Sequence, residues 1–152
     1  MRSPIEYKVA PAEFAAEYIR LRGLTRDNPI STARLEDLGI TAESWSEGIS
    51  LGETPGVLAE SDGRMIGYCF GSTRTGEVLV LAVLPDFEGQ GIGRQLLAAV
   101  VAQLRSHGHA RLYLGCSPDP AVRSHGFYRR LGWRGTGTLD NNGDEVLELL
   151  CS

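Results

Sequence analysis

The stretch that decides the fold reads E-V-L-V-L-A-V-L-P-D-F-E-G-Q-G-I-G-R-Q-L-L, from Glu77 to Leu97. Its first part, Glu77–Leu84, is almost continuously apolar, which is typical of a strand at a sheet centre covered on both faces. Three glycines follow, at 89, 91 and 93, and apolar residues then recur at helical spacing as far as Leu104. A strand leading through glycines into a helix predicts an anion site, because the first N–H groups of the helix point at the ligand.

Two familiar nucleotide-binding loops do not match this glycine-rich segment. A phosphate-binding Walker loop needs Gly-Lys-Ser/Thr, whereas Gly93 is followed by Arg94 and Gln95. The dinucleotide fingerprint G-x-G-x-x-G fails because its third glycine, counted from Gly91, is replaced by Leu96. A tight structural turn without a ligand remains an alternative interpretation.

The elements around this stretch predict a mixed α/β fold, with a partly antiparallel central sheet and flanking helices. Turn signals and apolar patterns predict strands at Ile5–Val9, Val57–Glu60, Met65–Ser72, Ala110–Gly115, Trp133–Leu139 and Glu145–Leu150. They predict helices from Pro11 to near Gly23, from a Ser31 cap to Leu38, and from an Asp119 cap with Pro120 at the first helical position to Gly132. The polar segment Thr41–Glu53 has no predicted structure, and its Trp45 either lines an acceptor pocket or packs.

Length and composition exclude several classes of protein. A chain of 152 residues predicts one domain, here 1–152, and 42% hydrophobic with 22% charged residues is typical of a soluble globular protein. A net charge of -4 argues against general nucleic-acid binding. The longest apolar runs have seven residues, and a membrane span needs about 20. Without a signal-like apolar segment at the start, we expect the cytoplasm.

Cysteine and histidine spacing argues against a disulfide framework and against a metal site. The chain has an odd number of cysteines, namely Cys69, Cys116 and Cys151, and no two of them have C-x-x-C spacing. The pair His107 and His109 has no acidic or thiol ligand nearby in sequence. We therefore expect no bound metal and a reducing compartment.

Two blocks of the chain resemble the GNAT superfamily of N-acetyltransferases. V-L-P-D-F-E-G-Q-G-I-G-R-Q-L-L, Val83–Leu97, closely resembles the acyl-CoA pyrophosphate loop of that family, Gln/Arg-x-x-Gly-x-Gly/Ala. Gly91 and Gly93 meet the pattern, whereas Glu88 departs from its first position. The block F-Y-R-R-L-G-W, Phe127–Trp133, is similar to the family's F-Y-x-x-L-G-F segment. The motifs cover about residues 77–133, and the order of elements matches over the whole chain.

This resemblance implies a GNAT-like acyl-CoA-binding fold, with acetyl-CoA as co-substrate and direct acetyl transfer to an amine. The pantetheine arm would pair with the central strand like an added strand, and the resemblance implies that the sheet splays apart there to admit it. Ser124, or Arg123, would replace an asparagine contact that Ala121 cannot make. The predicted cofactor-binding residues are Leu81, Ala82 and Val83 for the arm, and Gly89, Gln90, Gly91, Ile92, Gly93 and Arg94 for the pyrophosphate.

The same resemblance implies two catalytic residues. Tyr128 matches the general acid that protonates the departing thiolate, and otherwise it is a core tyrosine. Glu77 matches a position where some relatives carry a general base, and otherwise it is a solvated residue at a strand start. Cys116 stands where other relatives carry a carboxylate base, and it is either a nucleophile or a small buried hydrophobe.

We therefore expect an enzyme that acetylates a primary amine of a small molecule or a peptide. A protein N-terminal or lysine acetyltransferase and a non-catalytic acyl-CoA-binding module are the alternatives. Residues 1–88 carry 14 acidic and 8 basic residues, which favours a cationic acceptor. The expected partners are acetyl-CoA and the amine, with no nucleic acid and no membrane, and a homodimer is an open option.

Overall fold

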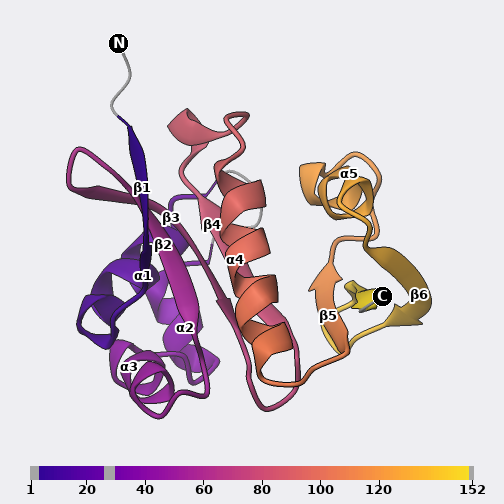
Figure 1. Cartoon of the computed structure of the whole chain (residues 1–152), viewed down its shortest axis with the longest axis horizontal. Helices are drawn as coiled ribbons and strands as arrows, with labels where there is room; N and C mark the ends of the chain where they lie inside the picture. The colour runs from indigo at the N-terminus through magenta and orange to yellow at the C-terminus, as the bar shows by residue number, and fades with distance from the viewer. Residues whose placement is uncertain (1–3, 26–29, 151–152) are drawn as a thin grey trace.

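Two antiparallel sheets form the framework of the protein, whose computed structural model describes residues 4–25 and 30–150 (Figure 1). The larger sheet has the strand order β1-β2-β3-β4 and the smaller one β5-β7-β6. The strands are β1 (Ile5–Val9), β2 (Gly56–Ser61), β3 (Arg64–Gly71), β4 (Val78–Val83), β5 (Arg111–Cys116), β6 (Arg134–Leu139) and β7 (Glu145–Leu150). The predicted mixed α/β class, with partly antiparallel strands and flanking helices, is confirmed, and the strands divide into two sheets.

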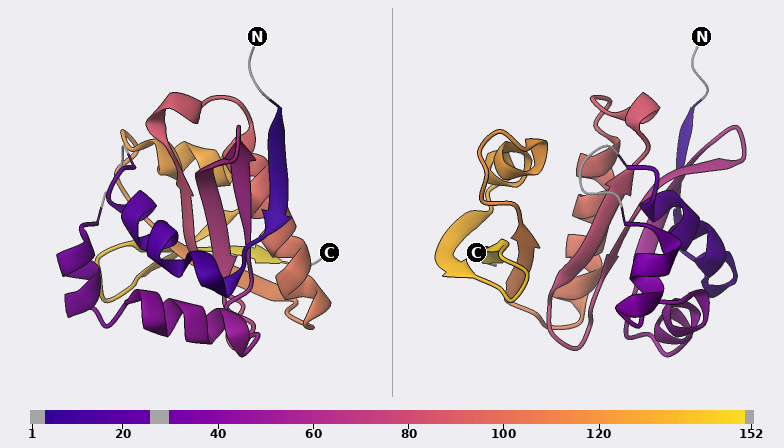
Figure 2. Two further views of the ribbon diagram at one scale, coloured as in Figure 1. Left: turned by 90° about the vertical axis from the view of Figure 1, so that its left-hand side faces the viewer. Right: turned by 180° about the vertical axis from the view of Figure 1, so that it is seen from behind.

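Helices cover both faces of the larger sheet (Figure 2). They are α1 (Ala15–Arg22), α2 (Thr32–Asp37), α3 (Ala42–Ser50), α4 (Ile92–Ser106) and α5 (Arg123–Arg130), with single 3-10 turns η1 (Ala12–Phe14) and η2 (Pro85–Phe87). On the α4 face, β3 presents glycines, and a Cβ added at Gly71 would lie 2.8 Å from Leu104. On the opposite face, the buried hydroxyl of Tyr68 donates a 2.7 Å hydrogen bond to the carbonyl of Tyr18 in α1.

An aromatic cluster fastens α1 and α3 to the sheet. Tyr18, Trp45, Tyr68 and Phe70 pack with ring centroids 4.8 to 5.7 Å apart. Three of these rings are fully buried, and large aromatic rings contribute most per residue to burying apolar surface. Trp45 therefore packs in the cluster.

One unpredicted helix and one helix start differ from the sequence-based expectation. The segment around Trp45 forms α3, because Thr41 and Ser44 make a reciprocal capping box that satisfies N–H groups at its start. The fifth helix begins at Arg123 and not at Pro120. The Oδ1 of Asp119 accepts a 2.9 Å hydrogen bond from the N–H of Ala121, so the Asp-Pro pair forms a turn before the helix.

β4 lies at the edge of its sheet, so the prediction of a central strand covered on both faces was wrong. Leu79 is 47% exposed, and only Val78 and Ala82 of this strand are buried. Cys69 and Cys116 are buried free thiols, and Cys151 lies outside the described residues. In residues 4–25 and 30–150, no helix has the length and apolar character needed to cross a membrane.

Candidate functional site

The two sheets meet at one point and then separate, which leaves an edge of β4 without a strand. β4 pairs along its length with β3. Towards β5 it makes, among the described residues, only the parallel bridge between Glu77 and Tyr113, where the N–H of Tyr113 donates to the carbonyl of Gly76 over 3.2 Å. Figure 1 shows the sheets diverging from there. The backbone of β4 beyond this bridge can therefore accept another extended chain.

The hydrogen-bond alternation of an antiparallel pair tells which residues face that edge. The N–H of Leu84 donates a 2.8 Å hydrogen bond to the carbonyl of Ile66 in β3. Alternate residues share this direction, so the backbone of Ala82 also faces β3, opposite Tyr68. The N–H and C=O groups of Leu81 and Val83 therefore point to the open edge.

The glycine-rich loop leaves open space in front of α4. Gly89 and Gly91 have φ values of 78° and 80°, the left-handed region that other residues enter only with strain. A Cβ at either position would meet nothing within 4 Å. Gly91 caps α4 without a side-chain hydrogen bond, and the first helical bond runs from the N–H of Gln95 to its carbonyl. The N–H groups of residues 92–94 thus have no acceptor within the helix and can bind an anion.

An ion pair joins this loop to α5. Arg123, the first residue of α5, donates from Nη1 to Oε2 of the partly buried Glu88. The carboxylate that departs from the family pattern is therefore balanced by a guanidinium. Ser124 follows in α5 and is partly buried, whereas Arg94 is exposed.

The ring of Phe127 brings the segment Phe127–Trp133 close to the glycine-rich loop at the start of α4. The Cζ atom of Phe127 lies 3.5 Å from where a Cβ of Gly93 would be. Its neighbour Tyr128 stacks edge-on against it, with centroids 5.0 Å apart, and Trp133 lies 6.1 Å away on the other side. The structure thus assembles the loop, the β4 edge and α5 at one end of the molecule.

Tyr128 is held in its protonated form. Burial raises the pKa of its hydroxyl, and the nearby thiols of Cys69 and Cys116 add to this effect. The guanidinium of Arg22 acts in the opposite direction, by favouring the ionised form. In the described part of the chain the hydroxyl makes no hydrogen bond, so it can donate one to a ligand.

Glu77 lies at the other end of β4. It lies six positions before Val83, a distance of about 20 Å along a strand, so it is not beside the loop. It is half-buried, and burial raises the pKa of its carboxyl, with a further contribution from the charge of Asp140 in the β6–β7 turn. A raised pKa brings a carboxylate closer to the range in which it can exchange protons near neutrality.

Cys116 ends β5 as a buried thiol. Burial is the largest cause that raises its pKa, which disfavours the thiolate that a nucleophile requires. Within residues 4–25 and 30–150, no group of three His, Cys, Asp or Glu side chains could hold a metal ion.

Two residues with an electrostatic effect on the candidate catalytic groups escaped the sequence analysis. Arg22, at the end of α1, acts on Tyr128, which lies about a hundred residues later in the chain. Asp140 acts on Glu77 from the turn between β6 and β7. Both effects depend on tertiary proximity, and no local pattern in the sequence signals either of them.

Comparison of the sequence with known proteins gives consistent matches. The profile described as "Acetyltransferase (GNAT) family" matches residues 18–133. A mycothiol acetyltransferase of Thermomonospora curvata is 34% identical over 131 residues, which are 81% of this chain and 41% of that protein. An uncharacterised N-acetyltransferase of Mycobacterium bovis is 27% identical, with 72% of each chain covered. The chain thus spans about two fifths of the first of these relatives.

Solved structures share the whole fold. The PaiA N-acetyltransferase of Thermoplasma acidophilum, in complex with coenzyme A, superposes with a TM-score of 0.78 at 19% identity and covers 97% of this chain and 99% of its own. YncA of Salmonella typhimurium, a protein solved with acetyl-CoA, gives a TM-score of 0.73 at 19% identity, over 99% of this chain and 95% of its own. Both comparisons establish the arrangement of helices and strands.

The effect of Asp140 on Glu77 can be tested by substitution. We expect Asp140→Asn to lower the pKa of Glu77, because the variant removes a negative charge that disfavours a second one nearby. The asparagine keeps the Oδ1 atom that accepts from the N–H groups of Asn142 and Asp144 over 2.8 and 3.0 Å. An NMR titration of the Glu77 side-chain carboxyl measures the pKa directly.

Asp119→Asn is the matched control, since Asp119 also accepts a backbone hydrogen bond in a turn but does not act on Glu77. An unchanged Glu77 pKa in Asp140→Asn would show that burial alone raises it.

Proposed function

Because this chain belongs to the GNAT acetyltransferase family, we propose that it transfers the acetyl group of acetyl-CoA to a primary amine of a small molecule or a peptide. One observation carries the proposal: the glycine-opened start of α4 lies at the end of β4, whose backbone edge has no strand partner among the described residues. An anion site next to a free strand edge fits a ligand with a pyrophosphate and an amide-bearing arm.

The residues present fit such a ligand. The open space at Gly89 and Gly91 admits the phosphates, which the N–H groups of residues 92–94 and the macrodipole of α4 attract. The exposed Arg94 adds positive charge, and a guanidinium binds phosphate oxygens well. Leu81 and Val83 offer backbone N–H and C=O groups to the arm. When bound, acetyl-CoA supplies the acetyl group as a reactive thioester.

Tyr128 is proposed as the general acid. Its raised pKa keeps the proton on the hydroxyl at neutral pH, and that hydroxyl is available because no described residue accepts from it. The proton passes to the departing sulfur. The guanidinium of Arg22 favours the tyrosinate that remains after this transfer, which makes the donation less costly.

Glu77 is proposed as the general base that removes a proton from the acceptor ammonium, so that the neutral amine can attack the thioester. It lies four residues before Leu81, a distance of about 13 Å along the strand, so it acts through water. Its raised pKa makes the carboxylate a stronger base than an ordinary glutamate.

The acceptor is the least defined part of the proposal. The acidic excess of the N-terminal part favours a cationic amine. Relatives named for mycothiol and for amino acids, the latter from Shewanella oneidensis, make these compounds the first acceptors to examine. A protein N-terminus or a lysine side chain is the alternative acceptor, and a non-catalytic acyl-CoA-binding module is the alternative from another class.

A thiol-release assay separates these functions. The protein is incubated with acetyl-CoA and a panel of amines: free amino acids, the deacetylated form of mycothiol, polyamines and short peptides with free N-termini or lysines. Amine-dependent release of CoA supports the enzyme and names its acceptor class. Binding of acetyl-CoA without release for any amine would favour the non-catalytic module.

The glycine loop can be tested by CoA binding. At one hundred times its dissociation constant, CoA should stabilise the fold by about 2.7 kcal/mol, a melting shift of a few degrees. We expect Gly91→Asp to abolish this shift, because the new carboxylate occupies the phosphate site and repels the phosphates. A melting curve with and without CoA provides the measurement.

Gly108→Asp is the matched control. Gly108 follows the other end of α4, has a φ of 92°, and has nothing within 4 Å of an added Cβ. Both variants therefore carry a similar backbone strain, and only Gly91→Asp should lose the shift. A normal CoA shift in a folded Gly91→Asp protein would remove the loop from the binding site.

The departure at Glu88 predicts a gain in affinity on substitution. Glu88→Gln removes a negative charge beside the phosphate site and releases Arg123 to interact with the phosphates. We expect the dissociation constant of CoA to fall about 2- to 5-fold at low ionic strength, with a smaller effect at high salt. Calorimetric titration at two salt concentrations measures both. Weaker binding would mean that the ion pair between Glu88 and Arg123 organises the loop. The negative charge of Glu88 would then have little direct effect on the affinity for CoA.

The role of Tyr128 can be tested by removing its hydroxyl. Tyr128→Phe keeps the ring contacts to Phe127 and Trp133, so folding and CoA binding should survive. We expect kcat to fall about 10²- to 10³-fold with little change in KM, the effect of losing a positioned acid. Tyr7→Phe, on the exposed strand β1, is the control. A near-normal kcat in Tyr128→Phe would assign this tyrosine to packing.

A further inference from the structure

The outer strand β1 is exposed and pairs on one side only. It forms the edge of the larger sheet, and in the described part of the chain its one strand partner is β2 (Figure 2). Four of its five residues are exposed, including the apolar side chains of Tyr7, at 37%, and Val9, at 75%. An exposed edge with apolar side chains is a template for pairing with another strand.

The backbone of β1 offers hydrogen-bonding groups at alternate residues. The N–H of Ala10 donates a 2.9 Å hydrogen bond to the carbonyl of Gly56, in continuation of the register between β1 and β2. By alternation, the backbones of Glu6 and Lys8 face β2, and those of Ile5, Tyr7 and Val9 face outward. Prolines at 4 and 11, which lack an N–H group, bound the strand at either end and limit pairing to these residues.

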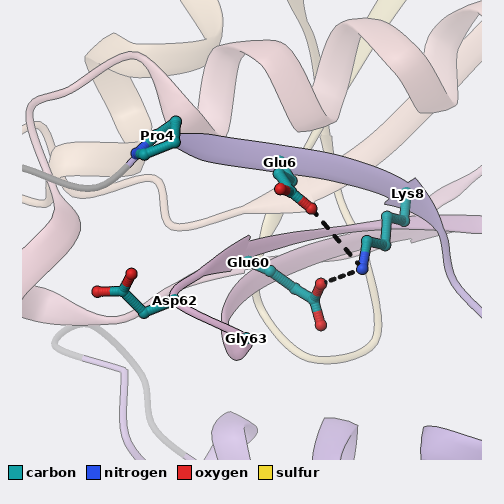
Figure 3. Close-up of a pocket in the computed structure, with 6 residues that line it drawn as sticks. All are labelled: Pro4, Glu6, Lys8, Glu60, Asp62 and Gly63. Carbon is teal, nitrogen blue, oxygen red and sulfur yellow. Dashed lines mark ion pairs between the residues drawn. The ribbon is translucent and has the colours of Figure 1, made fainter.

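The two charged side chains of β1 have opposite signs and flank Tyr7 symmetrically. Figure 3 shows them beside a hollow of about 190 Å³ that is lined by Pro4, Glu6, Lys8, Glu60, Asp62 and Gly63. Lys8 forms an ion pair with Glu60, directly opposite Glu6 in the register, and its Nζ lies 3.8 Å from Oε2 of Glu6. Read in either direction, the strand has the order apolar, charged, aromatic, charged, apolar.

We propose that two copies of this chain associate by antiparallel pairing of their β1 strands across a two-fold axis at Tyr7. In this register Tyr7 faces Tyr7 of the second copy, and Ile5 faces Val9. The outward-facing backbone groups of these residues then pair with one another. Glu6 lies opposite Lys8 of the second copy, and the symmetry repeats this contact, so two pairs of opposite charges form.

Charge selects this register among those that the backbone allows. Moving the two-fold axis to Glu6 sets the two Glu6 side chains against each other, and moving it to Lys8 does the same for the lysines. Like charges directly opposite each other destabilise a strand pair. Only the axis at Tyr7 makes both charge pairs attractive.

The proposed dimer joins two four-stranded sheets into one continuous sheet. The order β1-β2-β3-β4 puts the β4 edges, and with them the candidate acetyl-CoA sites, at its two outer ends. Pairing through β1 therefore leaves both sites accessible, and the proposal stands whether or not the chain transfers acetyl groups.

Charge reversal tests the dimer. Sedimentation velocity of the unaltered chain over a concentration series should show a species of twice the 16.5 kDa chain mass. Glu6→Lys and Lys8→Glu each turn two attractive pairs into repulsive ones and should weaken the dimer about tenfold or more. The double variant Glu6→Lys/Lys8→Glu restores both pairs and should dimerise again. An equimolar mixture of the two single variants should form a heterodimer, because all four charges are then complementary.

The controls keep the test independent of folding. Glu6→Lys sets a lysine opposite Glu60, so it preserves the attraction within the chain, and its loss of the dimer cannot come from fraying of β1. Glu36→Lys makes the same charge change on α2 and should leave the dimer intact. A monomeric unaltered chain, or a dimer that both single variants retain, would overturn the proposal. Equal weakening by Glu36→Lys would attribute the effect to net charge.

Discussion

The bridge between Glu77 and Tyr113 is the constraint on which the rest of the structure depends. At this point the residue that precedes β4 pairs with β5, and beyond it the described residues of β4 have a strand on one side only. Backbone groups at a free edge must find partners in water or in a ligand. The separation therefore creates the backbone edge at Leu81 and Val83, and it brings α5 opposite the start of α4.

The loop and α5 hold each other in place across this separation. Arg123 and Glu88 form an ion pair, and the ring of Phe127 covers the first turn of α4 at Gly93. These contacts link residues about 35 positions apart in the chain, and they explain why a carboxylate is tolerated beside a proposed phosphate site. The carboxylate of Glu88, which would repel the phosphates of the proposed ligand, therefore also ties the loop to α5.

The sequence predicted the glycine loop, α4 and the order of most elements along the chain well, because their signals are local. The left-handed backbone at position 91 favours glycine, and the apolar stripe from Ile92 to Leu104 is the buried face of α4. The family resemblance implied the split of the sheet, but the residues of β4 alone did not, because an apolar strand has the same pattern whether a strand or a ligand covers its edge. The start of α5 was misjudged because Asp119 caps a turn as readily as a helix.

The electrostatic effect of Arg22 on Tyr128 makes the proposed acid depend on a distant part of the chain. Arg22 ends α1, which the aromatic cluster fastens to the sheet, and its charge lowers the pKa that burial raises at Tyr128. Grafting the first helices of one family member onto the body of another would therefore retune the proton donor, although no residue of the donor site had changed. In such a chimera the strength of the proposed acid would follow the origin of α1.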